Sequence, residues 1–170
     1  MNSQQGIGLI EVLVALMLLA IAVLGFTAMQ MTAVKATDES LMRTRALTVM
    51  RGGAEMMRAN PGGVANFRSV LNGATTSITV NHCQATSTDS YCSVNDMAAR
   101  DALALKQFAT ENELSIRAEI CPGTSTTQPL TCLIAAWGDT TATIGTASTD
   151  CIKTTGEYVA GASCFVMEAY

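Results

Sequence analysis

The sequence predicts an α+β protein in which a long N-terminal helix packs on a small antiparallel sheet with disulfide-stapled loops. Three observations support this fold class. An apolar run opens the chain, a segment without proline continues it to residue 60, and six cysteines lie in the polar remainder. The 170 residues leave enough chain after the apolar run for one modest domain.

The first part of the expected helix, residues 7–34, is able to span a membrane. At about 1.5 Å per residue it is long enough to cross a hydrocarbon core of about 30 Å. The leader, residues 1–6, contains no Lys or Arg, and the apolar run is longer than the apolar region of an ordinary signal peptide. We therefore expect a retained single-pass helix and no ordinary signal cleavage.

Glu11 is the only ionisable residue between residues 7 and 34. A charged carboxylate at the centre of a membrane helix costs roughly 2.5–3.5 kcal/mol on insertion scales. Such a residue points to a function, and the alternative is a carboxyl group that stays protonated or reaches toward the interface.

The second part of the helix, residues 35–60, is expected to be amphipathic. It contains no proline, its only glycines are Gly52 and Gly53, and it runs into the stop signal Asn60-Pro61-Gly62-Gly63. One helix of roughly 80 Å could thus extend from Ile7 to about Asn60. The apolar face should pack on a sheet, with methionines as core filling. It comprises Met42, Ala46, Val49, Gly53, Met56 and Met57.

Residues 61–170 read as a small mixed head domain. Alternating or β-branched segments predict four strands, and one segment with apolar residues on a single face predicts a short helix at Asn95–Ala109. Polar loops are expected at Pro122–Pro129 and Gly138–Asp150. The expected strands are Ser77–Val80, Leu114–Ile120, Thr131–Trp137 and Cys164–Tyr170.

The cysteines favour disulfides over a metal site. Their number is even, there is no Cys-x2-Cys spacing, and His82 is the only histidine. Sequence alone leaves the connectivity open, and we favour the local pairs Cys83–Cys92, Cys121–Cys132 and Cys151–Cys164, of which the middle pair would staple two consecutive strands. An oxidising compartment would place the head outside the cytoplasm and the amino terminus inside it.

The sequence offers no catalytic, metal or cofactor site. His82 and Cys83 are neighbours, so on a strand their side chains would point to opposite faces and could not act as base and nucleophile. Neither a phosphate-binding glycine motif nor a GxSxG elbow is present. The charged fraction is 14% and the net charge is -4, so a basic face for nucleic acid is not expected either. The acids Asp96, Asp101, Glu111 and Glu113 are expected on a solvated surface, and Trp137 in the core or an interface.

The segment from Gly6 to Leu16, GIGLIEVLVAL, resembles the class III signal of type IV prepilins, with a short leader that ends in Gly and a Glu at the fifth position after it. The pattern IEVLVAL, a helix that runs on to MRANPGG, the cysteine-rich head and a late strand ending in Trp are similar to the PilV-like minor pilins of type IV pili. The resemblance implies a type IV pilin-like fold.

The resemblance also implies a set of partners and modifications. A prepilin peptidase would cleave between Gly6 and Ile7 and methylate the amino group of Ile7. In an assembling bundle, Glu11 of a neighbour would neutralise that amino group and fix the register. The implied partners are other minor pilins, the major pilin, an inner-membrane assembly platform and a tip adhesin. The implied location is the bacterial inner membrane, and afterwards the pilus.

Two alternatives remain open at this point. A minor pseudopilin of a type II secretion system shares the N-terminal features, and membership of a pilus or a secretion gene cluster would separate the two. A signal-anchored periplasmic enzyme or binding protein would need a reactive constellation in the head, and it leaves Glu11 unexplained.

Overall fold

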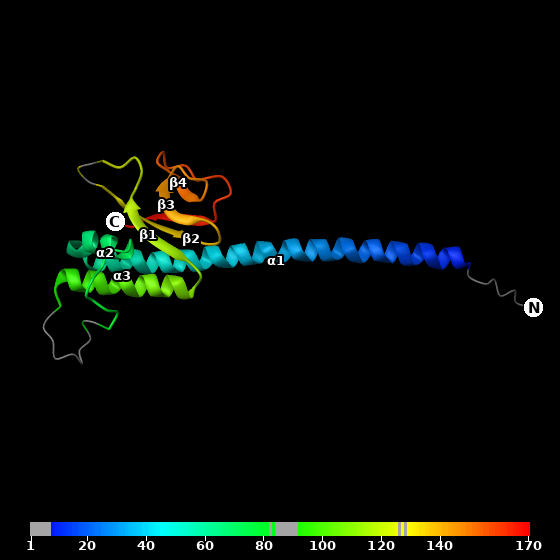
Figure 1. Ribbon diagram of the computed structural model, residues 1–170, viewed down its shortest axis with the longest axis horizontal. Coiled ribbons are helices and arrows are strands. Elements are labelled where there is room, and N and C mark those ends of the chain that lie inside the picture. The colour runs from blue at the N-terminus through cyan, green and yellow to red at the C-terminus, as the bar shows by residue number, and fades with distance from the viewer. Residues whose placement is uncertain (1–7, 82, 84–91, 126, 128) are drawn as a thin grey trace, which may run out of the picture. The chain divides into compact units, whose positions relative to one another are not determined.

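The computed structural model describes residues 8–81, 83, 92–125, 127 and 129–170 (Figure 1). It consists of two compact units, Met1–Leu41 and Met42–Tyr170. Helix α1, Leu9–Ala59, contributes to both. It ends immediately before Asn60 and Pro61, as the stop signal predicts, because proline lacks the amide hydrogen that would continue the helix.

The described residues of the second unit form three further helical segments: η1, Pro61–Gly63; α2, Val64–Leu71; and α3, Val94–Glu111. The prediction of a helix at residues 95–109 is confirmed. Its N-terminus is fixed by a capping box, in which the Asp96 amide donates to the Ser93 hydroxyl (3.2 Å) and the Ser93 amide donates to the Asp96 carboxylate (3.1 Å).

The predicted antiparallel sheet is confirmed and has the strand order β1-β2-β5. Its strands are β1, Ser115–Ile120; β2, Thr131–Ala136; and β5, Cys164–Glu168. Ala135 lies opposite Ile116 on one side and opposite Phe165 on the other. The strand β2 is therefore central, and β1 and β5 are the edges.

Two sequence predictions in the head are wrong. Ser77–Val80 is not a strand; Ile78 is packed against the core from an irregular segment, with its amide bonded to the Thr76 hydroxyl (3.2 Å). The expected loop Gly138–Asp150 contains β3, Thr141–Gly145, which pairs in parallel with β4, Asp150–Lys153. Helix α2 was not predicted from the sequence.

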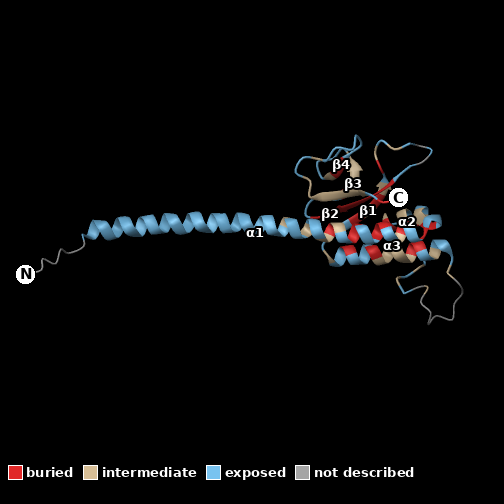
Figure 2. Ribbon diagram, turned by 180° about the vertical axis from the view of Figure 1, so that it is seen from behind, coloured by how far each residue is buried: buried red, intermediate tan, exposed pale blue. Residues whose placement is uncertain are grey.

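The core of the second unit lies on both faces of β2 (Figure 2). Leu133 and Ala135 pack with α1, α2 and α3, whereas Ile134 and Ala136 pack with β3, β4 and Cys151. All six residues of β2 are buried for this reason. The pair β3–β4 thus covers the sheet face that the helices leave free (Figure 1).

The apolar face predicted for residues 35–60 is the face that α1 buries. Four of its predicted members are buried, Ala46, Val49, Gly53 and Met57, and Met42 and Met56 are partly buried. Met50 and Ala54, which were not predicted, are buried with them. At Gly53 the helix approaches its neighbours so closely that an added Cβ atom would lie 2.7 Å from Leu105 Cδ2 of α3 and 3.0 Å from Leu133 Cδ1 of β2. Gly53 thus permits α1 to pack against a helix and a strand at the same point.

The three disulfides join Cys83 to Cys92, Cys121 to Cys132 and Cys151 to Cys164, and these are the local pairs that the sequence analysis favoured. The pair Cys121–Cys132 bridges the ends of β1 and β2, and Cys151–Cys164 links β4 to β5. Each of the latter two bonds thus connects segments that already pack together.

The two adjacent glycines of α1 give opposite predictions. Gly53→Ala should destabilise the second unit by about 1–3 kcal/mol, because Leu105 and Leu133 must shift to admit a methyl group. Gly52→Ala meets no atom within 4 Å and should stabilise it by about 0.5–1 kcal/mol, since alanine is the better helix former.

Denaturant unfolding of the full chain in detergent micelles measures both changes. Gly52→Ala is the matched control for the effect of helix propensity. Equal stability changes in the two variants would contradict the close packing at Gly53.

Candidate assembly site

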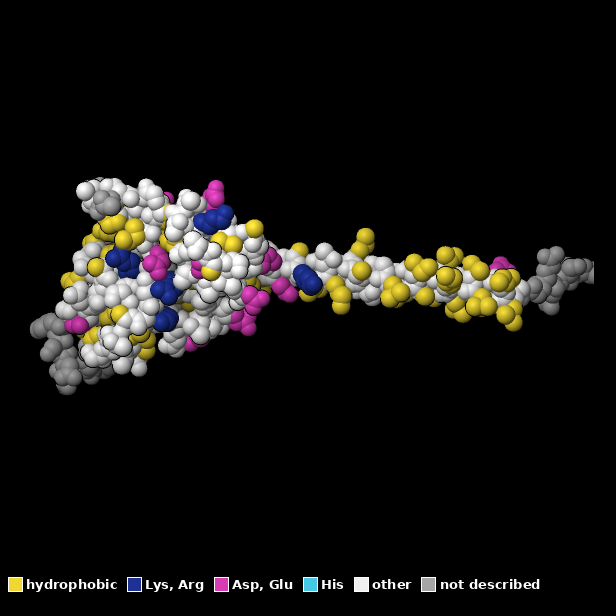
Figure 3. Space-filling view, turned by 45° about the horizontal axis from the view of Figure 1, so that its top comes forward, with side chains coloured by type: hydrophobic (Ala, Val, Ile, Leu, Met, Phe, Trp, Pro, Cys, Tyr) yellow, Lys and Arg dark blue, Asp and Glu magenta, His cyan; other side chains and the backbone are white. Residues whose placement is uncertain are grey.

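The N-terminal part of α1 exposes an apolar surface on every side. Its large side chains are between 49% and 82% exposed from Leu9 to Val34, and Figure 3 shows apolar groups along this segment. Its most apolar 18-residue window has a mean hydropathy of 2.8. Among the described residues, α1 is the one helix long and apolar enough to cross a membrane. Such a surface needs lipid or other protein segments to cover it.

The hydroxyl groups within this segment are satisfied by the helix itself. Thr27 donates to the Leu24 carbonyl (2.9 Å) and Thr32 donates to the Ala28 carbonyl (3.1 Å). These local bonds allow threonine to lie in an apolar helix without an external partner. They leave Glu11 as the group that sets this segment apart, because it is the only ionisable residue between positions 7 and 34.

Glu11 lies in the first turn of α1 and is exposed. Its amide donates to the Gly8 carbonyl (2.9 Å), which holds the residue in the first turn of the helix. A carboxylate near a helix N-terminus interacts favourably with the helix dipole. Among the residues that the structure describes, none donates a hydrogen bond to its side chain. The expected cleavage site, Gly6 and Ile7, lies outside the described residues.

Two acidic residues of α3 that were expected on a solvated surface make specific polar contacts. Asp96 forms the capping box, and Asp101 is paired with Arg100 (2.6 Å) with its side chain only 19% exposed. Glu111 accepts a bond from Gln107 (3.0 Å) on the exposed face. Trp137 is 7% exposed and belongs to the core, as expected.

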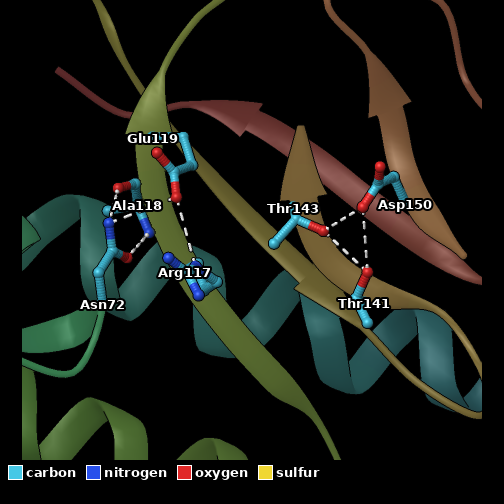
Figure 4. A network of polar contacts seen from close by, with 7 residues as sticks. All are labelled: Asn72, Arg117, Ala118, Glu119, Thr141, Thr143 and Asp150. Atoms are coloured by element: carbon cyan, nitrogen blue, oxygen red, sulfur yellow. Dashed lines mark hydrogen bonds and ion pairs between the residues drawn. The ribbon is translucent and has the colours of Figure 1, made fainter. Parts of the chain in front are cut away.

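The exposed edge of β1 is closed by a side chain that the sequence analysis did not single out (Figure 4). The Asn72 amide nitrogen donates to the Ala118 carbonyl (2.7 Å), and the Ala118 amide donates to the Asn72 side-chain oxygen (3.0 Å). Asn72 thus imitates a neighbouring strand at one residue of the edge, which discourages pairing with another chain there. The dipeptide Asn72-Gly73 predicts a turn. It does not predict the contact between Asn72 and Ala118, which lie 46 positions apart in the sequence.

A second polar cluster fixes the turn between β3 and β4 (Figure 4). Thr143 donates to one oxygen of Asp150 (2.6 Å), and the Ala147 amide donates to the other (2.8 Å). These two bonds, together with a longer one from Thr141, hold the pKa of Asp150 below its usual value of 3.8. Gly145 lies against the same carboxylate, because an added Cβ atom there would collide with it.

The described part of the head shows no arrangement typical of a reactive centre. Within the described ranges, no three His, Cys, Asp or Glu residues are arranged to hold a metal ion. All six cysteines are in disulfides. A hollow of about 260 Å³ beside the Cys121–Cys132 bond is lined by Tyr158, Val166 and Glu168, and it contains no pair of nucleophile and base.

Two family comparisons define the class of this chain. Residues 1–27 match the prokaryotic N-terminal methylation motif, and the residues after them match a type IV pilin domain. The chain is therefore pilin-like, with a membrane-anchoring helix. The motif implies processing by a prepilin peptidase and assembly with other pilins. The type IV pilin family that this domain matches is structural and non-enzymatic.

The particular domain, residues 28–103, is described as Tt1218-like, type IV pilin Tt1218. The expected type IV pilin-like fold is confirmed by this match together with α1, the antiparallel sheet and the disulfides. No match was found among curated proteins or among solved structures.

Asp150 predicts a pH dependence of stability. Because its pKa is lowered in the folded state, its contribution is complete above the ordinary value of 3.8 and is lost as the pH falls through the lower folded value. The melting temperature of Asp150→Asn should lie below that of the wild type at neutral pH, and the gap should close in acid.

Thermal unfolding in micelles between neutral pH and strong acid tests this expectation. Asp139→Asn, which removes an exposed carboxylate just before β3, is the control. The difference in melting temperature between this variant and the wild type should not change with pH. A gap between wild type and Asp150→Asn that is constant over the whole pH range would contradict the role of Asp150.

Proposed function

We propose that this protein is a minor pilin of a type IV pilus, similar to PilV, the type IV pilus modification protein. The observation that carries the proposal is the single carboxylate of Glu11 in the first turn of an exposed apolar helix. It lies within a methylation motif that precedes a type IV pilin domain. Fibre subunits need both an apolar segment for the filament core and a device that fixes register.

The membrane arrangement follows from the two parts of the chain. Before assembly, residues 7–34 cross the inner membrane once, with the amino terminus in the cytoplasm and the head, residues 61–170, in the periplasm. Three disulfides in the head support an oxidising compartment for it. Residues 35–60 continue the helix as its amphipathic part.

Processing creates the partner of Glu11. The prepilin peptidase removes residues 1–6 by cleaving between Gly6 and Ile7, and it methylates the new amino group. In the filament, that positive group pairs with Glu11 of a neighbouring subunit. Each charge alone is costly in an apolar environment, whereas the pair is favourable and selects one axial position.

The minor-pilin role concerns the beginning of the fibre. The subunit joins other minor pilins in a complex at the tip, which primes addition of the major pilin through the inner-membrane assembly platform. A large adhesin docking on this tip complex would link it to adhesion and twitching motility. The PilV-like pattern from IEVLVAL to MRANPGG favours this role over that of a major pilin.

The substitution Glu11→Val tests the assembly role. It keeps the helix apolar but leaves the neighbouring amino group unpaired, which costs about 3 kcal/mol or more for a buried ion pair. Incorporation into sheared pili should fall by roughly a hundredfold. N-terminal sequencing and intact mass should still show a chain that begins at methylated Ile7, formed only when the peptidase is active.

Glu55→Val is the matched control, since it removes an exposed carboxylate of the same helix whose ion pair with Arg58 (2.7 Å) contributes little. Normal incorporation of Glu11→Val would refute the pairing. A chain that still begins at Met1 with active peptidase would refute the processing step and favour a permanent anchor.

Deletion of the gene tests the minor-pilin role separately. Surface pili should decrease strongly while the cellular level of the major pilin stays unchanged, because priming precedes elongation. Electron microscopy and immunoblotting measure the two quantities. Unchanged piliation would argue against priming, and loss of protein secretion with normal pili would identify the alternative, a minor pseudopilin of a type II secretion system.

A further inference from the structure

The three disulfides differ in how accessible their cysteines are. Cys121 and Cys132 are 4% and 3% exposed, and Cys151 is completely buried, although its partner Cys164 is partly exposed. In Cys83–Cys92, by contrast, both cysteines are partly exposed. Thiol–disulfide exchange needs a thiolate to reach one sulfur and the other sulfur to leave as a thiolate.

This difference decides where exchange is favourable. Attack on Cys164 would expel Cys151 into the apolar cluster on the outer face of β2, where a charged thiolate would be desolvated. Attack on Cys121 or Cys132 is hindered by burial at the end of two paired strands. For Cys83–Cys92, neither cysteine is buried, so burial disfavours neither of them as the attacked or the leaving sulfur.

The bond Cys83–Cys92 also lies outside the framework of the fold. Cys83 is in a turn, and Cys92 precedes the N-cap residue of α3. The start of α3 is held by contacts that do not depend on the disulfide. The Asn60 side chain donates to the Val94 carbonyl (2.8 Å), and the Asn66 side chain donates to the Asn95 carbonyl (2.7 Å). The capping box of Ser93 adds local bonds.

The backbone of Cys83 supplies an independent observation. Its φ angle is +68°, in the left-handed region that is unfavourable for residues other than glycine. This backbone conformation occurs at a residue of the disulfide itself. Strain of this kind favours opening.

We propose that Cys83–Cys92 is a thiol–disulfide exchange site, which a dithiol oxidoreductase reduces while the head stays folded. One thiolate of the dithiol attacks a sulfur of the pair, the other cysteine leaves, and the second thiol of the dithiol resolves the mixed disulfide. Two electrons and two protons pass to Cys83 and Cys92, and the dithiol becomes a disulfide. The site is separate from Glu11 and stands whether or not the chain is a minor pilin.

The test uses the full chain in detergent micelles with dithiothreitol as the dithiol. After graded exposure, free thiols are alkylated and quantified by peptide mass spectrometry. Cys83 and Cys92 should be alkylated at least about tenfold faster than the other four cysteines, which corresponds to a difference of 1.4 kcal/mol in barrier. Circular dichroism should show that the reduced protein keeps its helix and sheet.

The double variant Cys83→Ala/Cys92→Ala tests whether the head folds without this disulfide. It should have the wild-type spectrum and a cooperative transition, whereas the matched variant Cys151→Ala/Cys164→Ala should lose stability more strongly. Equal alkylation rates for the three pairs would overturn the proposal. Labelling of Cys83 and Cys92 only under conditions that unfold the head would overturn it as well.

Discussion

The close approach of α1, α3 and β2 at Gly53 is the contact around which the second unit is built. Leu105 and Leu133 occupy the space that a side chain at this position would fill. The residues of α1 that surround Gly53 on the same face are small or flexible, so one turn of helix after another can lie against both neighbours. A bulkier face would separate the helices from the sheet and open the core.

The position of β2 follows from this contact. Once Leu133 faces the helices, alternation along the strand directs Ile134 to the opposite face, which would be exposed without a second cover. The pair β3–β4 provides that cover, and the bond between Cys151 and Cys164 attaches it to β5. An antiparallel sheet with one free face would have needed polar residues on that face, where β2 has Cys132, Ile134 and Ala136.

Sequence reasoning succeeded where local chemistry decides the structure. Pro61 ends α1, and the spacing of Ala98, Ala102, Leu105 and Ala109 defines α3. It failed where tertiary packing decides. Ile78 and Val80 alternate like a strand but have no partner strand, and β3 is a short Thr-rich segment that is stable only against the sheet. Glu11 could be singled out because it is the one charge in an apolar run, and its role stays a prediction. Asn72 was not, because its role depends on a strand 46 positions away.

Apolar contacts and polar groups contribute differently to the structure. Apolar contact supplies most of the free energy but is non-directional, so a smooth apolar helix can slide along its neighbours at little cost. Position is then set by a few polar groups that are costly when unpaired. In the second unit, Asn72 fixes the edge of β1 and Asp150 fixes the turn between β3 and β4. In the first unit, Glu11 is the one charged group between residues 7 and 34 and lies within the methylation motif, and the proposed function assigns it the task of fixing register.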